Sequence, residues 1–135
     1  MTMTSVFARS ASIVAAALLA AACSNKLGGE LDVDGTAFKP SSCRSGRVYG
    51  FTGVRVVAAD GRALHVVSTA TGEGRAVLFA KGANTGTDVG LCGPFHVEDQ
   101  NSKINDVKNV EGRADLACEA NGIEISGKLT FENCH

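Results

Sequence analysis

The residues best suited to covalent or metal chemistry in this chain of 135 residues are five cysteines and three histidines. Zinc sites normally show close local spacing such as Cys-x2-Cys or His-x3-His, and covalent haem needs Cys-x-x-Cys-His. None of these patterns occurs here, so we expect neither a metal nor any other cofactor. We interpret His65, His96 and His135 as ordinary strand or surface residues.

Other catalytic and metal-binding patterns are equally weak. There is no Gly-x-Ser-x-Gly elbow, and no specific arrangement of serine, histidine and aspartate. The stretch Asp32 to Gly35, "DVDG", resembles the start of an EF-hand loop, but Ala37 stands where that loop needs glycine and Cys43 where it needs glutamate. We interpret these carboxylates as strand-end and turn residues, and we do not expect an enzyme.

The first 22 residues have the layout of a secretory signal peptide. Residues 1–10 are polar and carry one positive charge, Arg9, and residues 11–22 are apolar and rich in alanine. This apolar run is about a dozen residues long, whereas a membrane-spanning helix needs about 20. We therefore expect residues 1–22 to be removed during export.

The end of this leader resembles the lipobox of bacterial lipoproteins, in the stretch Leu19-Ala20-Ala21-Ala22-Cys23. In that family the leader is cut just before the cysteine, whose thiol carries a diacylglycerol and whose new amino terminus is acylated. The resemblance implies that Cys23 is lipidated and anchors the protein to a membrane of the cell envelope. Because Ser24 rather than aspartate follows, it also implies the outer membrane in a diderm host. The usual box has leucine where this chain has Ala20, so a soluble exported protein with a free Cys23 is the alternative.

The number of cysteines agrees with export. If Cys23 carries lipid, an even number remains, and in an oxidising compartment these should form two disulfides. The disulfide candidates are Cys43, Cys92, Cys118 and Cys134. Their spacing does not choose among the pairings.

The mature chain is predicted to be all-β. From Leu31 onward, short runs rich in Val, Ile, Thr and Phe alternate with Gly, Asn and Asp, and no run shows a sustained helical period. We count seven or eight strands, which predicts a small antiparallel sandwich or barrel stapled by two disulfides. Residues 31–135 form a single domain, and residues 23–30 form the lipid attachment site and a tether that reaches roughly 25 Å.

The clearest element is a hairpin at Asn121-Gly122, because a type I′ turn needs positive φ at both of its central residues. This turn places Cys118 opposite Ile125. One face of the hairpin is then apolar, with Leu116, Cys118, Ile123, Ile125, Leu129 and Phe131. The other face is polar, with Glu119, Glu124, Lys128 and Thr130.

A second hairpin is predicted at Asp60-Gly61, with an unresolved register. A two-residue loop would pair Val57 with Leu64 and put Val54 and Val56 on the opposite face, and a longer loop or a bulge would remove that conflict. We further expect strands at residues 30–38 and 74–80, a loop at residues 84–95, and a polar strand or irregular edge at residues 103–112.

Charge and composition limit the function. The net charge is -1 and the charges are interspersed, so the clustered basic footprint of a nucleic-acid-binding protein is missing. Asn101, Asn105 and Asn109 recur every four residues, which fits turns and loops, a helix face, or an edge that binds a carbohydrate or a partner. The absence of tryptophan and the single tyrosine, Tyr49, argue against sugar binding.

The leading hypothesis is a lipid-anchored envelope protein with a structural or interaction role. Its expected partners are the membrane, through lipid on Cys23, and an envelope protein. The alternatives are a small-ligand-binding β-barrel, which would need a large apolar cavity, and an enzyme of unknown type.

Overall fold

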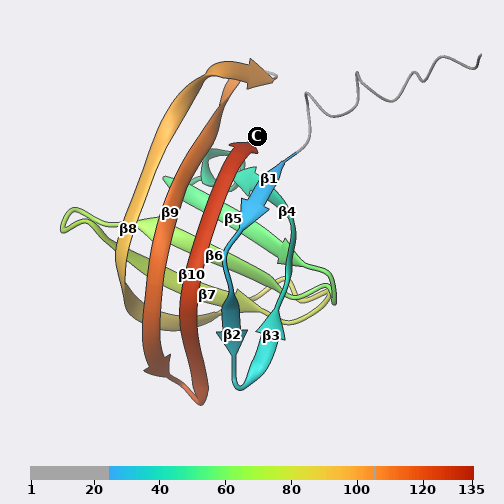
Figure 1. Cartoon of the computed structure of the whole chain (residues 1–135), viewed down its shortest axis with the longest axis vertical. Helices are drawn as coiled ribbons and strands as arrows, with labels where there is room; N and C mark the ends of the chain where they lie inside the picture. The colour runs from blue at the N-terminus through green and yellow to red at the C-terminus, as the bar shows by residue number, and fades with distance from the viewer. Residues whose placement is uncertain (1–24, 105) are drawn as a thin grey trace, which may run out of the picture.

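The computed structural model describes residues 25–104 and 106–135, which form ten antiparallel strands and one short 3-10 helix (Figure 1). The strands are β1 (Lys26–Gly28), β2 (Leu31–Val33), β3 (Thr36–Phe38), β4 (Pro40–Ser45), β5 (Gly53–Ala58), β6 (Ala63–Ser68), β7 (Glu73–Phe79), β8 (Thr87–Ile104), β9 (Val107–Ala120) and β10 (Ile123–Cys134); the helix is η3 (Gly46–Tyr49). The strand order is β3-β2-β10-β9-β8-β7-β6-β5-β4, and β1 also pairs with β10. The predicted all-β antiparallel class is confirmed, with ten strands rather than seven or eight.

The strands form two layers that share β8. Its first part, from Thr87 to Pro94, pairs with β7, and its second part, from Phe95 to Ile104, pairs with β9. Figure 1 shows β9 and β10 along the long axis, with β5, β6 and β7 crossing behind them. β8 changes its pairing partner shortly after Gly93, whose φ of 119° suits glycine and where a Cβ would overlap the carbonyl of Asp115.

The space between the layers is filled by a single apolar core. Apolar residues alternate with other residues along the strands and fill this core, because every second side chain of a strand points to the same face. The largest fully buried apolar side chains come from both layers: Phe38, Leu64, Ile125, Leu129, Val54, Val56, Val66 and Val89. This interior is a packed core.

The C-terminal hairpin confirms the sequence prediction. Asn121 and Gly122 have φ values of 53° and 78°, as a type I′ turn requires, and Cys118 lies opposite Ile125. The predicted apolar face is buried or partly buried, and the predicted polar side chains are exposed.

The Asp60-Gly61 hairpin takes the longer connection. Val57 lies opposite Ala63, and the Ala58 N–H donates to the Arg62 carbonyl at 2.8 Å. The pairing drawn from a two-residue loop is therefore wrong by one residue, and a slip of one residue exchanges the two faces of a strand. With the observed register, Val54, Val56, Leu64 and Val66 all face the core.

Three other boundaries differ from the sequence predictions. Residues 30–38 are not one strand, because Asp34 and Gly35 (φ 53° and 76°) form a turn between β2 and β3. The loop predicted at residues 84–95 becomes strand from Thr87 onward. Two register shifts against β7, between Asp88 and Gly90 and between Leu91 and Pro94, interrupt the alternation there. Within the predicted tether, Lys26–Gly28 form β1, with Leu27 opposite Phe131. The polar strand predicted at residues 103–112 is confirmed only from Val107 onward, because β8 ends at Ile104 and Lys103 lies opposite Lys108 of β9.

Candidate interaction surface

The four later cysteines form two disulfides that join one layer to the other. Cys43–Cys134 links β4 to β10 across 91 residues, with Cα atoms 5.1 Å apart. Cys92–Cys118 links the first part of β8 to β9 across 26 residues, with Cα atoms 4.7 Å apart. The prediction of two disulfides is confirmed, and the fold selects their pairing. Cys23 lies outside the described residues.

The first described residue, Asn25, is fixed at the disulfide-bonded end of β4 and β10. The Cys43 N–H donates to Asn25 Oδ1 at 3.0 Å, and Asn25 Nδ2 donates to the Asn133 carbonyl at 2.8 Å. The Asn133 N–H donates to Gln100 Oε1 at 2.9 Å. The chain therefore enters the domain where β4, β8 and the end of β10 meet.

The outer face of the layer formed by β4 to β8 carries a cluster of rings around His65, here named the His65 cluster. The ring centroids of Tyr49, Phe51 and Phe79 lie 5.5, 4.7 and 4.5 Å from that of His65. The Arg55 guanidinium lies 5.1 and 5.3 Å from the centroids of the Tyr49 and Phe79 rings, in cation–π geometry. Three of the chain's seven tyrosine and phenylalanine residues thus contact one histidine on an outer face.

The strand register and the η3 connection build this cluster. Arg55 lies directly opposite His65 in the β5–β6 ladder, and cross-strand partners share a face. Tyr49 and Phe51 arrive from the connection around η3, which begins where the Ser45 hydroxyl accepts a hydrogen bond from the Arg47 N–H at 3.3 Å. Gly46 is buried against the Phe51 ring, where a Cβ would overlap it. The connection therefore folds back over the sheet.

His65 is electrostatically unusual. Burial among the rings, and secondarily the positive charge of Arg55, lower the pKa of His65 from 6.5 to about 4. Arg55 Nη1 lies 2.9 Å from His65 Nε2. At neutral pH the imidazole is therefore uncharged, and Nε2 accepts the hydrogen bond from the guanidinium.

The layer formed by β4 to β8 also carries exposed hydrophobic side chains. Among the described residues, the large hydrophobic side chains classed as exposed are Val48, Tyr49 and Leu91, at 44%, 44% and 49%. Val48 and Tyr49 belong to η3, and Leu91 lies opposite the exposed Arg75 in the β7–β8 ladder. Single exposed hydrophobic residues are ordinary, but their accumulation on one face is typical of an interaction site. The outer face of β9 and β10 is polar instead.

Arg44 and Arg55 give this face two positive charges that no neighbouring carboxylate among the described residues neutralises. Arg44 lies directly opposite Arg55 in the β4–β5 ladder, and within residues 25–104 and 106–135 neither forms an ion pair with a carboxylate. By contrast, Arg47 and Arg75 are paired with Asp99 (3.3 Å) and Asp88 (2.6 Å). Like charges opposite one another are unfavourable in a sheet, so an anionic group at Arg44 and Arg55 would relieve this repulsion.

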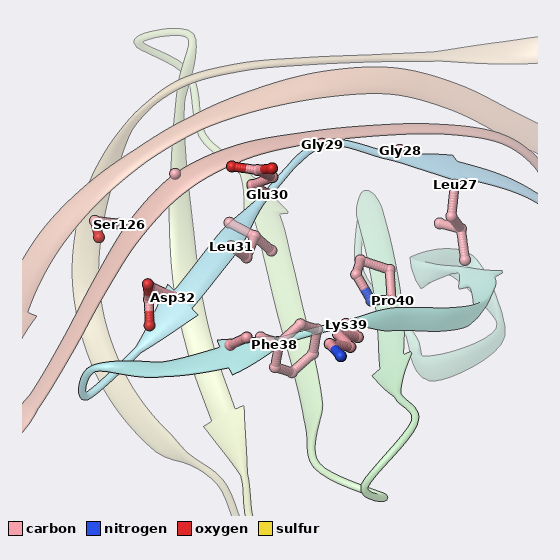
Figure 2. A pocket seen from close by; sticks show the side chains of 12 residues that line it. Leu27, Gly28, Gly29, Glu30, Leu31, Asp32, Phe38, Lys39, Pro40 and Ser126 are labelled. Atoms are coloured by element: carbon pink, nitrogen blue, oxygen red, sulfur yellow. The ribbon is translucent and has the colours of Figure 1, made fainter.

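A separate hollow of about 540 Å³ lies where β1 and β2 face the β3–β4 segment (Figure 2). Leu31 and Phe38, which are buried and lie opposite one another in the β2–β3 ladder, line it, and Glu30, Asp32 and Lys39 supply charged groups around it. It lies along a seam of the surface, because β3 and β4 are the two ends of the strand order. None of the cysteine, histidine or asparagine residues considered from the sequence lines it.

The remaining candidates from the sequence do not converge. His96 contacts Glu98 at 3.7 Å on β8, away from the His65 cluster, and His135 is the last residue. No group of three His, Cys, Asp or Glu side chains in the described part of the chain is placed to hold a metal ion. Asp34 and Gly35 form a hairpin turn, as interpreted from the sequence.

The spaced asparagines lie on strands. Asn101 belongs to β8 and Asn109 to β9, so both the turn-and-loop prediction and the helical alternative are wrong for these two residues. Asn105 lies outside the described residues. Asn109 is 7% exposed, and its Oδ1 has no hydrogen-bond partner among the described residues.

Sequence reasoning missed the His65 cluster. The small number of aromatic residues argued against a sugar-binding surface, whereas three of them lie together around His65 on one face. Arg55, His65 and Phe79 alternate with core residues along their strands. This alternation predicts that the three share the outer face once the longer Ala58–Arg62 connection has set the register.

The fold and surface define a disulfide-stapled antiparallel β domain with an aromatic and arginine-bearing outer face. No protein-family model matches the chain, and neither a curated protein nor a solved structure shows significant similarity to it. No helix in the described part of the chain has both the length and the apolar character needed to cross a membrane.

Proposed function

We propose that this protein is a lipid-anchored protein of the bacterial cell envelope, and that its β domain binds a partner through the outer face of the β4–β8 layer. The observation that carries the interaction role is the concentration on that one face of exposed apolar side chains and of Arg44 and Arg55, which form no ion pair with a carboxylate among the described residues. An outward-facing surface fits a protein partner better than a small ligand, because the space between the layers is occupied by core side chains.

The anchor is supported by the leader, by the lipobox resemblance and by the cysteine pairing. Cys43 pairs with Cys134 and Cys92 with Cys118, so Cys23 has no counterpart within the chain. A lipid on its thiol accounts for this odd cysteine. Ser24 after the cysteine favours the outer membrane in a diderm host.

Intact mass spectrometry of the protein purified from membranes tests the anchor. We expect a chain that starts at Cys23 and carries the added mass of lipid, with four free thiols that appear only after reduction. The Cys23→Ser variant is the matched control and should lose the lipid mass. An unmodified wild-type chain would refute the anchored function.

Site-specific photo-crosslinking in cells tests the interaction role. A photoreactive residue in place of Leu91 lies on the exposed outer face of the β4–β8 layer, and one in place of Thr130 lies on the polar outer face of β10. We expect a discrete protein adduct from position 91 and none from position 130. Equal labelling at the two positions, or none at either, would contradict a partner on this face.

A further inference from the structure

We propose that the η3 end of the domain lies against an anionic membrane surface, with Val48 and Tyr49 at the interface and Arg44 close to lipid phosphates. This inference rests on the proposed anchor at Cys23 and deepens it. It assigns an orientation to the domain and a lipid partner to one end of its outer face. The protein contact proposed above is then confined to the β7–β8 side of that face, where Leu91 lies opposite Arg75.

The chain enters the domain at the end where β4 and β10 are joined by a disulfide. Asn25 is held by Cys43 of β4 and by Asn133 near the end of β10. Two residues of chain span at most about 7 Å, so an anchor at Cys23 would hold this end of the domain close to the bilayer. The anchoring chain therefore leaves little freedom for the opposite end to face the membrane.

The short helix η3 lies at the same end of the domain. Gly46 begins η3 three residues after Cys43, which is at most roughly 10 Å of chain. Arg47 of η3 pairs with Asp99 at 3.3 Å, and the neighbouring Gln100 bonds to Asn133. In Figure 1 the coil between β4 and β5 lies toward the same end of the long axis as the C-terminus and the start of β1.

The exposed side chains at this end match the chemistry of an anionic lipid surface. Val48 and Tyr49 are each 44% exposed, and tyrosine is well suited to a membrane interface because its ring is apolar while its hydroxyl remains hydrated. Arg44 and Arg55 form a cross-strand pair next to η3 and have no carboxylate partner among the described residues. Guanidinium groups bind phosphate through paired hydrogen bonds, so anionic lipid would neutralise this pair.

A lipid surface is favoured over a protein as the occupant of this end because of the chain entry. A protein would have to fit between η3 and the bilayer to which the chain is attached. Leu91 remains accessible to a protein, because its strand, β8, lies three strands from β5, about 14 Å across the sheet.

Tryptophan fluorescence tests the orientation, because the chain contains no tryptophan. The full lipidated protein is reconstituted into vesicles of brominated phosphatidylcholine and phosphatidylglycerol, either as Tyr49→Trp or as the control Ala117→Trp on the exposed face of β9. We expect quenching and a blue shift at position 49 and an unchanged spectrum at position 117. Adding Arg44→Gln to Tyr49→Trp should reduce the quenching in vesicles with phosphatidylglycerol and leave it unchanged in phosphatidylcholine alone.

Equal or absent quenching at positions 49 and 117, in protein whose mass shows lipid on Cys23, would overturn the orientation while leaving the anchor intact. So would a protein cross-link from position 49 in place of quenching. If the mass shows no lipid, the anchored function fails on its own evidence. The same two tryptophan variants, added to the vesicles as protein that carries no lipid, then test the membrane contact. Absence of quenching at position 49 overturns that contact.

Discussion

Removing the Cys43–Cys134 disulfide is expected to destabilise the domain more than removing Cys92–Cys118, because it closes the longer loop. If a disulfide acts by restricting the unfolded chain, the Cys92–Cys118 bridge, which spans 26 residues, contributes about 3.5 kcal/mol to the free energy of unfolding. The Cys43–Cys134 bridge spans 91 residues, but its loop contains the inner one, so its effective length is about 65 residues and its contribution about 4.3 kcal/mol.

The assay is urea unfolding of two double variants, Cys43→Ala with Cys134→Ala and Cys92→Ala with Cys118→Ala, each followed by circular dichroism. Cys43, Cys92 and Cys134 are buried, so both variants also lose packing, and each serves as the control for the other. We expect the unfolding free energy of the first variant to be lower than that of the second by about 1.1 kcal/mol. The bridge that remains closes 26 residues in the first variant (about 3.5 kcal/mol) and, once the inner bridge is gone, 91 residues in the second (about 4.6 kcal/mol).

A less stable Cys92–Cys118 variant would refute the loop-length reasoning, because packing rather than loop entropy would then decide the order. Two variants as stable as the wild type would refute it more completely. Reduction of the wild type should cost roughly the sum of the two contributions, about 8 kcal/mol, which is comparable to the whole stability of a typical domain.

Further predictions concern two glycines, two leucines and His65. Gly122→Ala should cost about 1 to 2 kcal/mol in urea unfolding, because a Cβ there meets only open space and only the positive φ is strained. Gly127→Ala should cost clearly more, because its Cβ would overlap the Glu30 carbonyl, and equal costs would contradict the β2–β10 geometry. Leu64→Ala, at a fully buried position, should cost about 2 to 5 kcal/mol, whereas Leu91→Ala at an exposed position should change stability by no more than about 0.5 kcal/mol. In an NMR titration His65 should have a pKa of about 4, and Arg55→Met should raise that pKa only partly, because burial is the larger cause. Since the folded-state pKa of His65 lies below the unfolded value of 6.5, its contribution to stability is complete above about pH 6.5 and is lost as the pH falls toward 4. The melting temperature of His65→Phe should therefore depend less on pH in that window, and an unchanged dependence would contradict this account.

Local turn chemistry and strand alternation determined much of this protein from the sequence alone. Asn121-Gly122 predicted both a hairpin and its register, because few residues other than Asn and Gly accept positive φ at adjacent positions. The resulting alternation separated buried from exposed side chains over β9 and β10. The even number of later cysteines likewise predicted two disulfides.

Only the tertiary structure decided the features that depend on long-range contact. The Asp60-Gly61 hairpin needed the sheet to choose between two registers, because one extra residue in the connection exchanges the core and outer faces. The disulfide pairing depends on which strand ends the two layers bring together, and Cys43 and Cys134 are 91 residues apart. The His65 cluster draws on η3, β5, β6 and β7, so no local pattern contains it. Spacing along the chain encodes turns and faces, whereas neighbours across a sheet are set by how the strands assemble.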